Sequence, residues 1–209
     1  MHSVSFIIKF ATQKSYTMNT ETHPFEPFIP QNAKILMLGT FPPKQERWSM
    51  EFFYPNKIND MWRIMGIIFF NNKNRFWNES EKRFILDDIK TFLNNINLAL
   101  YDTAKRVKRL KNNASDKFLE IIEPVDIKQI LLDNPDIKAI ITAGEKATDT
   151  LASLMGTNIP KVNSHITFTF ENRTITHYRA PSSSRAYPLS LEKKAEAYRN
   201  IFITEGYDI

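Results

Sequence analysis

Two short motifs, far apart in the chain, carry the residue types that could do chemistry. Gly39-Thr40-Phe41-Pro42-Pro43 follows the apolar run 35–38, and Ala180-Pro181-Ser182-Ser183-Ser184-Arg185 follows the run 174–178. Each motif is a loop stiffened by glycine or proline at the end of an expected strand, where open α/β sheets place their ligand clefts. Between the motifs, Tyr54 offers an aromatic face and Asn59 an amide. Together these groups could stack on a nucleic-acid base and form hydrogen bonds with its edge.

The hydrophobic pattern from position 33 onward alternates between strand-like and helix-like segments, as an α/β sheet requires. We expect strands at 34–38, 97–101 and 137–142, and a hairpin of 166–170 with 174–178. Helices are expected at 59–70, from an N-cap at Ser80, at 103–110, 124–134 and 145–155, and from an N-cap at Ser190. The predicted fold class is therefore a three-layer α/β/α arrangement with a central, mainly parallel sheet.

The composition predicts one domain with a sizeable core. The chain has 209 residues, of which 42% are apolar and 12% aromatic, enough to fold alone. Residues 1–31 have no sustained period and carry three prolines, so we expect a tail and lead-in there and a single domain at 32–209. No apolar run reaches the roughly 18 residues of a membrane span, and the segment 4–10 is too short for a secretory signal. We expect a soluble, cytoplasmic monomer.

The cysteine and histidine content restricts the chemistry. The chain has no cysteine, which excludes disulfides, thiolate zinc sites and iron–sulfur clusters. Its four histidines, at positions 2, 23, 165 and 177, have no metal-ligand spacing. We therefore predict a mechanism without metal or cofactor. The net charge of +5 and the pI near 9.3 suit a polyanionic partner, although many basic proteins bind none.

Five motifs, in their order along residues 33–203, resemble those of the uracil-DNA glycosylase superfamily. The closest branch is the hypoxanthine (deoxyinosine) DNA glycosylases, followed by the mismatch-specific uracil/thymine glycosylases. The resemblance implies a monofunctional enzyme of base excision repair that removes hypoxanthine or uracil, flipped out of double-stranded DNA. The motifs are Gly39-Thr40-Phe41-Pro42, Asn59-Asp60-Met61-Trp62, Leu98-Ala99-Leu100-Tyr101-Asp102, Ile140-Ile141-Thr142-Ala143-Gly144-Glu145-Lys146-Ala147 and Ala180-Pro181-Ser182-Ser183-Ser184.

The resemblance assigns roles to Tyr54 and Asn59. Tyr54 stands five residues before Asn59, the offset at which relatives place the aromatic residue that stacks on the extruded base. The structural alternative is that Tyr54 merely covers the sheet. Asn59 matches the helix-start asparagine that similar enzymes use for catalysis, and its amide could orient the attacking water. Because asparagine is also a favoured N-cap, Asn59 could instead serve the helix.

The resemblance also suggests how the base is read. Backbone N–H groups of Thr40 and Phe41 could face a base carbonyl, but Phe41 stands where the best-known uracil glycosylases carry a water-activating aspartate. Asp102 falls where they read the base with asparagine. As an ionised acceptor Asp102 could take the N1–H of hypoxanthine or the N3–H of uracil, or it could cap the expected helix at 103–110. Ala180 replaces a histidine that donates to the leaving base, so modest activity is expected.

Two basic or hydroxyl-bearing segments are candidates for contacts with the DNA backbone. Ser182, Ser183, Ser184 and Arg185 resemble a loop that presses into the minor groove beside the target, although serine-rich turns are common. The densest positive cluster lies on the expected helix at 103–110 and just beyond it, where it could form a stripe along the phosphates or only a solvated face. Its members are Lys105, Arg106, Lys108, Arg109 and Lys111.

Two other functions compete with that of a glycosylase. A catalytically silent nucleic-acid or nucleotide-binding module could keep the fold while lacking the acid at Phe41 and the histidine at Ala180. A serine hydrolase that uses the serines at 182–184 is a poor alternative, because the chain has no Gly-x-Ser-x-Gly motif and His177 lies too near in sequence for the usual triad.

Overall fold

The core of the protein is a five-stranded sheet, seen in a computed structural model that describes residues 20–110 and 116–209. Its strand order is β5-β2-β8-β10-β9. The first four strands are parallel, and β9 runs antiparallel to β10. The strands are β2 (Ile35–Gly39), β5 (Leu98–Asp102), β8 (Ala139–Ala143), β9 (Ser164–Phe170) and β10 (Arg173–Ala180).

Three of these strands are buried along their whole length. Every residue of β2, β5 and β8 is buried, because parallel strands between two helical layers have no solvent face and read as continuous apolar runs. The β9–β10 hairpin turns where it was expected, and its outer strand alternates between exposed and more buried positions. These runs explain why the strands could be predicted from the sequence.

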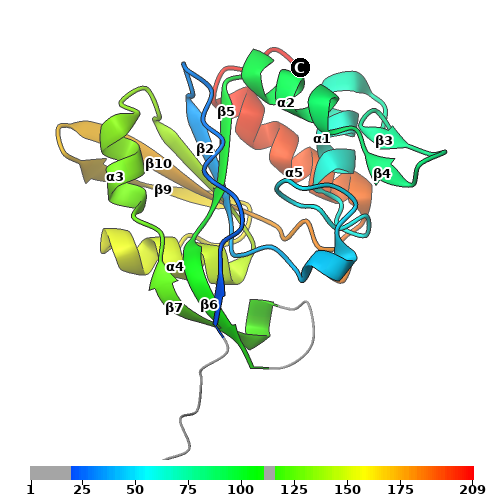
Figure 1. Cartoon of the computed structure of the whole chain (residues 1–209). Helices are drawn as coiled ribbons and strands as arrows, with labels where there is room; N and C mark the ends of the chain where they lie inside the picture. Colours follow the sequence, from blue (N-terminus) through cyan, green and yellow to red (C-terminus); the bar gives the residue numbers. More distant parts are fainter. Residues whose placement is uncertain (1–19, 111–115) are drawn as a thin grey trace, which may run out of the picture.

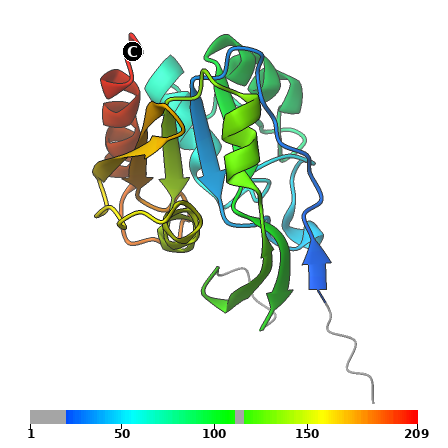
Figure 2. The same ribbon diagram turned by 90° about the vertical axis from the view of Figure 1, so that its left-hand side faces the viewer.

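Helices cover both faces of the sheet. Figures 1 and 2 show α3 and α4 on one face and α1, α2 and α5 on the other, with α1 packed against α5. The predicted three-layer α/β/α fold class is therefore confirmed. The helices are α1 (Met61–Phe70), α2 (Leu86–Asn95), α3 (Ile127–Asp133), α4 (Glu145–Met155) and α5 (Leu191–Thr204), and short 3-10 turns are η1 (Gln45–Arg47) and η2 (Asp116–Phe118).

Of two serines predicted to cap helices, one does so in the structure and the other does not. The Ser190 side chain accepts a hydrogen bond from the N–H of Lys193 at the start of α5, as expected. The prediction that Ser80 caps a helix was wrong. Asn78 Oδ1 accepts from the N–H and hydroxyl of Ser80 and from the N–H of Glu81. This closes the turn of a small hairpin, β3 (Trp77–Asn78) with β4 (Arg83–Phe84), and α2 begins only after it.

The expected helix at 103–110 is instead the strand β6 (Ala104–Arg109), so that prediction was wrong. β6 pairs antiparallel with β1 (Thr20–Thr22) on one side and β7 (Leu119–Pro124) on the other. Register shifts between Ala104 and Val107 let both residues reach the buried side, where they pack with Phe41. Pairing on two edges overrides the local helical pattern.

The segment expected as a lead-in contributes to the folded unit from Thr20 onward. Besides β1, Phe28 exchanges two backbone hydrogen bonds with Leu100 of β5, at 3.0 and 2.9 Å. Three apolar side chains of this segment pack against the main core: Phe25, Phe28 and Ile29. Residues 1–19 and 111–115, including the segment 4–10 and Lys111, lie outside the described residues. In the described part of the chain, no helix is both long and apolar enough to cross a membrane.

Candidate active site

A cavity of about 1000 Å³ opens at the carboxyl ends of β2, β5, β8 and β10. It is formed by the loops that follow these strands and by the starts of α1 and α4. Both sequence motifs contribute to it, although more than 130 residues separate them. The candidate residues that line it are Thr40, Phe41, Tyr54, Asn59, Asp102, Ser182, Ser183, Ser184 and Arg185.

Gly39 lies beside the carboxylate of Asp102, its partner in the β2–β5 pairing. A Cβ atom at Gly39 would lie 2.3 Å from Asp102 Oδ1 and 3.4 Å from the Tyr54 hydroxyl oxygen. Only glycine can therefore occupy this position without displacing Asp102. Asp102 is 7% exposed, and its Oδ2 lies 2.9 Å from His23 Nε2. It caps no helix, because β6 follows it.

Tyr54 combines a strained backbone with a buried hydroxyl. Its φ is +52°, a left-handed conformation uncommon for a bulky residue. Its ring meets Trp62 edge to face at 6.3 Å. The hydroxyl is buried and has no hydrogen-bond partner among the described residues. Burial, with smaller effects of Tyr198 and two carboxylates, raises the pKa of Tyr54 well above its usual range. The hydroxyl is therefore neutral at physiological pH.

Asn59 serves the start of α1 and also lines the cavity. Its Oδ1 accepts a hydrogen bond of 2.9 Å from the N–H of Met61, the first residue of the helix. Asn59 also forms an isolated antiparallel bridge with Ser184. Asp60 occupies the N-cap position and makes no capping hydrogen bond with its side chain, so Asn59 supports the helix from the residue before the cap. Its place in the cavity wall leaves a contribution to chemistry open to the same side chain.

A buried ion-pair network holds residues 182–185, here called the serine loop, against the start of α1. The N–H of Asp60 donates to the Ser183 carbonyl oxygen at 2.9 Å. Lys194 Nζ donates to Asp60 Oδ2 at 3.0 Å and to the Ser184 carbonyl oxygen at 2.8 Å. Arg185 Nε donates to Asp60 Oδ1 at 3.2 Å. The Lys194 side chain is only 1% exposed. Its role could not be predicted from the sequence, because a lone lysine in an amphipathic helix ordinarily faces solvent.

Phe41 and Ala180, at which the sequence resemblance implies the loss of polar catalytic groups, are both buried. Phe41 packs with Val107 and contacts His23 edge to face at 5.3 Å. The carbonyl oxygens of Gly39 and Thr40 accept hydrogen bonds from the residues that follow β5, at 2.9 and 3.1 Å. The first motif is therefore a rigid loop anchored on β6.

Among the described residues, Asp116 is one of three carboxyl residues that line the cavity besides Asp102, together with Glu145 and Asp149, and it was not among the site residues predicted from the sequence. Burial raises the pKa of Asp116 to about 6; Asp102 adds to the rise, while the Thr40 hydroxyl, Lys146 and Arg109 oppose it. No pattern in the sequence could have found Asp116, because it lies in a connection without hydrophobic periodicity.

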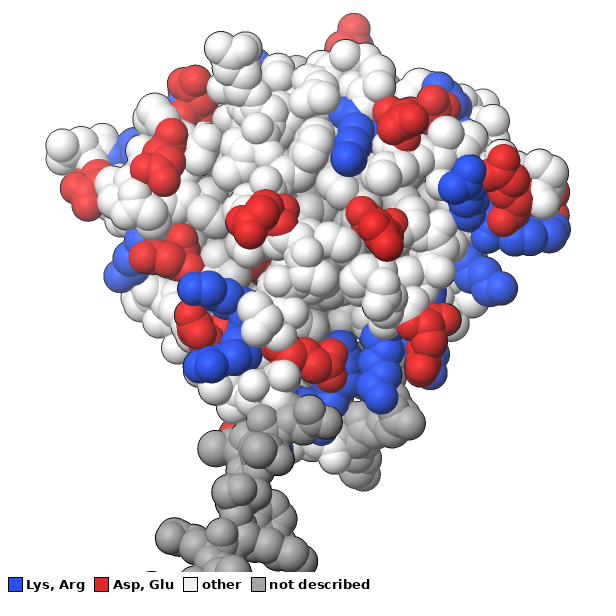
Figure 3. All heavy atoms as spheres, viewed as in Figure 1, with Lys and Arg blue, Asp and Glu red and all other residues white. Residues whose placement is uncertain are grey.

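The basic cluster does not form a helical stripe. Arg109 Nε donates to both carboxylate oxygens of Glu21, at 2.8 and 2.9 Å, its guanidinium also donates to the Pro42 carbonyl oxygen, and its side chain is 6% exposed. Lys105 and Arg106 both pair with Glu123. Figure 3 shows acidic and basic side chains interspersed on this face. Contact of Lys105 and Arg106 with DNA stays a prediction, whereas Arg109 anchors the first motif.

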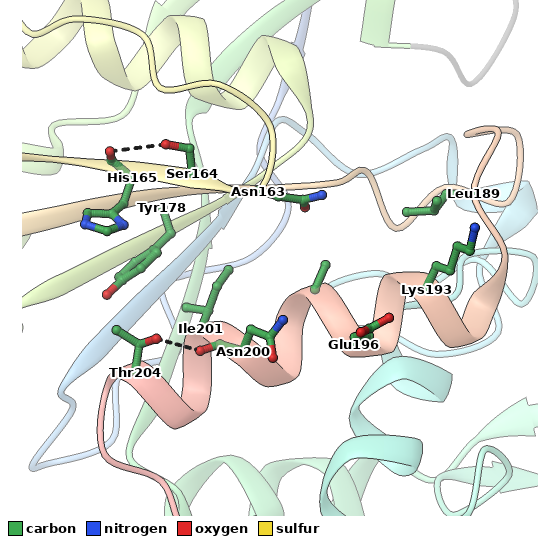
Figure 4. A pocket seen from close by; sticks show the side chains of 11 residues that line it. Asn163, Ser164, His165, Tyr178, Leu189, Lys193, Glu196, Asn200, Ile201 and Thr204 are labelled. Atoms are coloured by element: carbon green, nitrogen blue, oxygen red, sulfur yellow. Dashed lines mark hydrogen bonds between the residues drawn. The ribbon is translucent and has the colours of Figure 1, made fainter.

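A second hollow of about 400 Å³ lies between the β9–β10 hairpin and α5 (Figure 4). Its walls include His165, Tyr178 and Lys193. Tyr178 donates a hydrogen bond to Glu205 at 2.6 Å. None of the candidate residues of the two motifs lines this hollow, whereas the larger cavity is lined by both motifs.

Comparison with known proteins bears on the fold. No family model and no curated protein sequence matches the chain. A solution NMR structure of a protein from Methanosarcina acetivorans, described as a "putative Uracil DNA glycosylase", superposes with a TM-score of 0.59 at 20% sequence identity. The match covers 89% of this chain and 99% of the other. The chain therefore has a uracil-DNA glycosylase-like α/β fold.

Proposed function

We propose that the protein is a DNA glycosylase that removes a deaminated base from DNA by hydrolysing its N-glycosidic bond. The observation that carries the proposal is the single cavity in which Tyr54, Asn59, Asp102 and the serine loop meet. The fold shared with a protein named for uracil excision supports it. The order of the five sequence motifs supports it independently.

The cavity offers the groups that base excision requires. An enzyme must rotate the nucleotide out of the stack, hold its face and its edge, and then break the bond to the sugar. Tyr54 would stack on the base and Asp102 would accept a ring N–H from its edge. Ser182–Ser184 and Arg185 would hold the phosphates beside the extruded nucleotide.

The reaction adds the oxygen of water to C1′ of the sugar while the C1′–N bond breaks. The electron pair of that bond leaves with the base, which takes up the proton that the water loses. The sugar then resembles an oxocarbenium cation, so nearby negative charge and oriented donors stabilise the transition state. Asn59 would orient the water, and the carboxyl groups of Asp102 and Asp116 would favour the positive sugar. Since Phe41 and Ala180 provide neither an acid nor a donor, we expect turnover slower than that of a uracil-specific enzyme.

The proposed substrates are hypoxanthine and uracil in double-stranded DNA. Their removal would be a step of base excision repair. Deamination replaces an unprotonated ring nitrogen of adenine or cytosine by an N–H beside a carbonyl. A carboxylate can only accept hydrogen bonds. Asp102 would therefore favour the deaminated base over its parent.

A panel of duplexes tests the proposal. Duplexes carrying uracil, hypoxanthine, xanthine or a thymine mismatch are incubated with the protein, and abasic sites are cleaved with alkali. Cleavage of the strand that carries hypoxanthine or uracil is the expected result. Binding to these duplexes without cleavage of any strand would favour the silent nucleic-acid-binding module instead.

A further inference from the structure

His23 lies behind the cavity wall, where it contacts the lining residue Asp102 from a segment with no expected structure. Its Nε2 lies 2.9 Å from Asp102 Oδ2, across 79 positions of the chain. The two side chains are only 1% and 9% exposed. The other carboxylate oxygen, Oδ1, lies beside Gly39. Oδ2 of Asp102 is thus bound by His23, and Asp102 is also a residue of the cavity wall.

A carboxylate at Asp102 requires Nε2 of His23 as the hydrogen-bond donor, and the surroundings of Nδ1 allow this in either charge state of the ring. Its Nδ1 lies 3.2 Å from the backbone nitrogen of Phe25 and 2.8 Å from the Phe25 carbonyl oxygen. In the neutral ring Nδ1 can accept from the Phe25 N–H, and in the cation it can donate to the Phe25 oxygen. In both cases Nε2 carries a hydrogen that Asp102 can accept.

The imidazole is also held by packing and by the main chain. The His23 ring contacts four aromatic rings at centroid distances between 5.0 and 6.0 Å, which belong to Phe25, Phe41, Phe53 and Tyr101. The N–H of His23 donates to the Lys105 carbonyl oxygen at 2.8 Å, directly after the β1–β6 pairing. His23 therefore has little freedom to turn away from Asp102.

We propose that His23 is a positioning residue that fixes the Asp102 carboxylate through Oδ2 and leaves Oδ1 to accept a hydrogen bond from the base. The inference rests on the proposed function, since it concerns base recognition in the same cavity. His23 thereby selects bases with a ring N–H at the Asp102 position, such as hypoxanthine and uracil, against adenine and cytosine.

The test measures binding, so that it does not depend on turnover. Each duplex carries hypoxanthine or adenine on a 2′-fluorinated sugar, which resists cleavage because the fluorine destabilises the oxocarbenium state. The measured quantity is the ratio of the two dissociation constants, obtained by fluorescence anisotropy. His23→Leu removes the donor at similar volume, and His23→Gln keeps an N–H donor. Thermal unfolding establishes that each variant is folded.

We expect the wild type to prefer hypoxanthine. His23→Leu should lower that preference roughly tenfold or more, the effect of losing a hydrogen bond to a charged group, and His23→Gln should keep most of it. A folded His23→Leu variant with the wild-type ratio would overturn the inference. So would a wild type that binds both duplexes equally.

Asp102→Asn gives a second test that leaves His23 in place. The His23 N–H should bind the amide oxygen and turn the amide NH2 toward the base, so the preference for hypoxanthine should vanish or reverse. An Asp102→Asn variant that keeps the wild-type ratio would overturn the inference even if both His23 variants fail to fold. Preference without base release would instead contradict only the proposed glycosylase activity.

Discussion

Asn59 has a structural role at the start of α1 and a proposed catalytic role in the cavity, and substitutions can distinguish the two. Its Oδ1 accepts from the Met61 N–H at the start of α1, and the residue lines the cavity. Serine caps a helix about as well as asparagine, whereas alanine does not. A residue with a purely structural role would therefore tolerate serine.

For Asn59→Ala we predict a loss of about 0.5–2 kcal/mol in the free energy of unfolding, because the hydrogen bond to the Met61 N–H at the helix start is removed. Asn59→Ser should keep most of that stability. Both variants should lose turnover more than affinity for the duplex, since the amide would act on the water and not on the base. Urea unfolding and single-turnover cleavage measure the two effects. Full activity in Asn59→Ser would assign Asn59 to the helix alone.

Substitutions of Tyr54 can distinguish the contribution of ring stacking to binding from that of the hydroxyl group. Its hydroxyl is buried without a partner among the described residues, so its removal costs no hydrogen bond. We predict that Tyr54→Phe binds an extruded base as the wild type does and is at least as stable. Tyr54→Ala should weaken binding by about 1–3 kcal/mol, the value of stacking one base. Fluorescence anisotropy measures both, and a loss of binding in Tyr54→Phe would mean that the hydroxyl, not the ring face, contacts the base.

At the scale of elements, the sequence was informative where local pattern and burial agree. The helix 145–155 and the hairpin near 171–172 were placed correctly, because amphipathic periodicity and turn residues are local signals. The strand β6 could not be found in this way. Its identity depends on β1 and β7, which lie far from it in the chain.

Dependence on contacts between distant segments also explains which site residues could not be predicted from the sequence. Both motif loops were expected at the cavity because they follow strands, and the carboxyl ends of parallel strands meet at one edge of a sheet. His23, Asp116 and Lys194 reach the site through contacts between distant segments. The contact of Lys194 with Asp60, for example, spans 134 positions, and no short-range pattern encodes it.

The buried Lys194 should be essential for the position of the serine loop. Lys194→Met leaves Asp60 buried with only Arg185 as a charged partner. Removing one partner of a buried ion pair costs about 3–5 kcal/mol, and we expect the lower end because Arg185 stays. Chemical denaturation of the variant measures this. Lys193→Met, at the exposed neighbouring position, is the matched control and should change stability by no more than about 0.5 kcal/mol. Equal stability of the two variants would contradict the role of Lys194.

At the scale of the whole molecule, stability should depend on pH through Asp116. Burial raises its pKa from 3.8 to about 6, so the folded state binds a proton that the unfolded state has released. This contribution to stability is present at low pH and is lost as pH rises through about 6. Asp116→Asn removes the cost of ionisation. Relative to the wild type, the variant should gain up to about 3 kcal/mol between pH 4 and pH 8.

His177 changes stability with pH in the opposite direction to Asp116. The measured quantity is therefore the difference in unfolding free energy between Asp116→Asn and the wild type. Burial lowers the pKa of His177 to about 4, so both proteins lose stability through this residue as pH falls below its unfolded value of roughly 6.5. Unfolding midpoints measured across this range isolate Asp116. A constant difference between variant and wild type at all pH values would show that Asp116 titrates normally.

The central claim is that one cavity at the carboxyl edge of the sheet takes a single deaminated base and cuts it from its sugar. Release of the free base tests this most directly. With protein in excess over a duplex that carries hypoxanthine or uracil, mass spectrometry should detect the intact base, one for each abasic strand formed, and the parent adenine or cytosine duplex should release none. Prolonged incubation that yields no free base, while the same samples bind the duplex, would contradict the account.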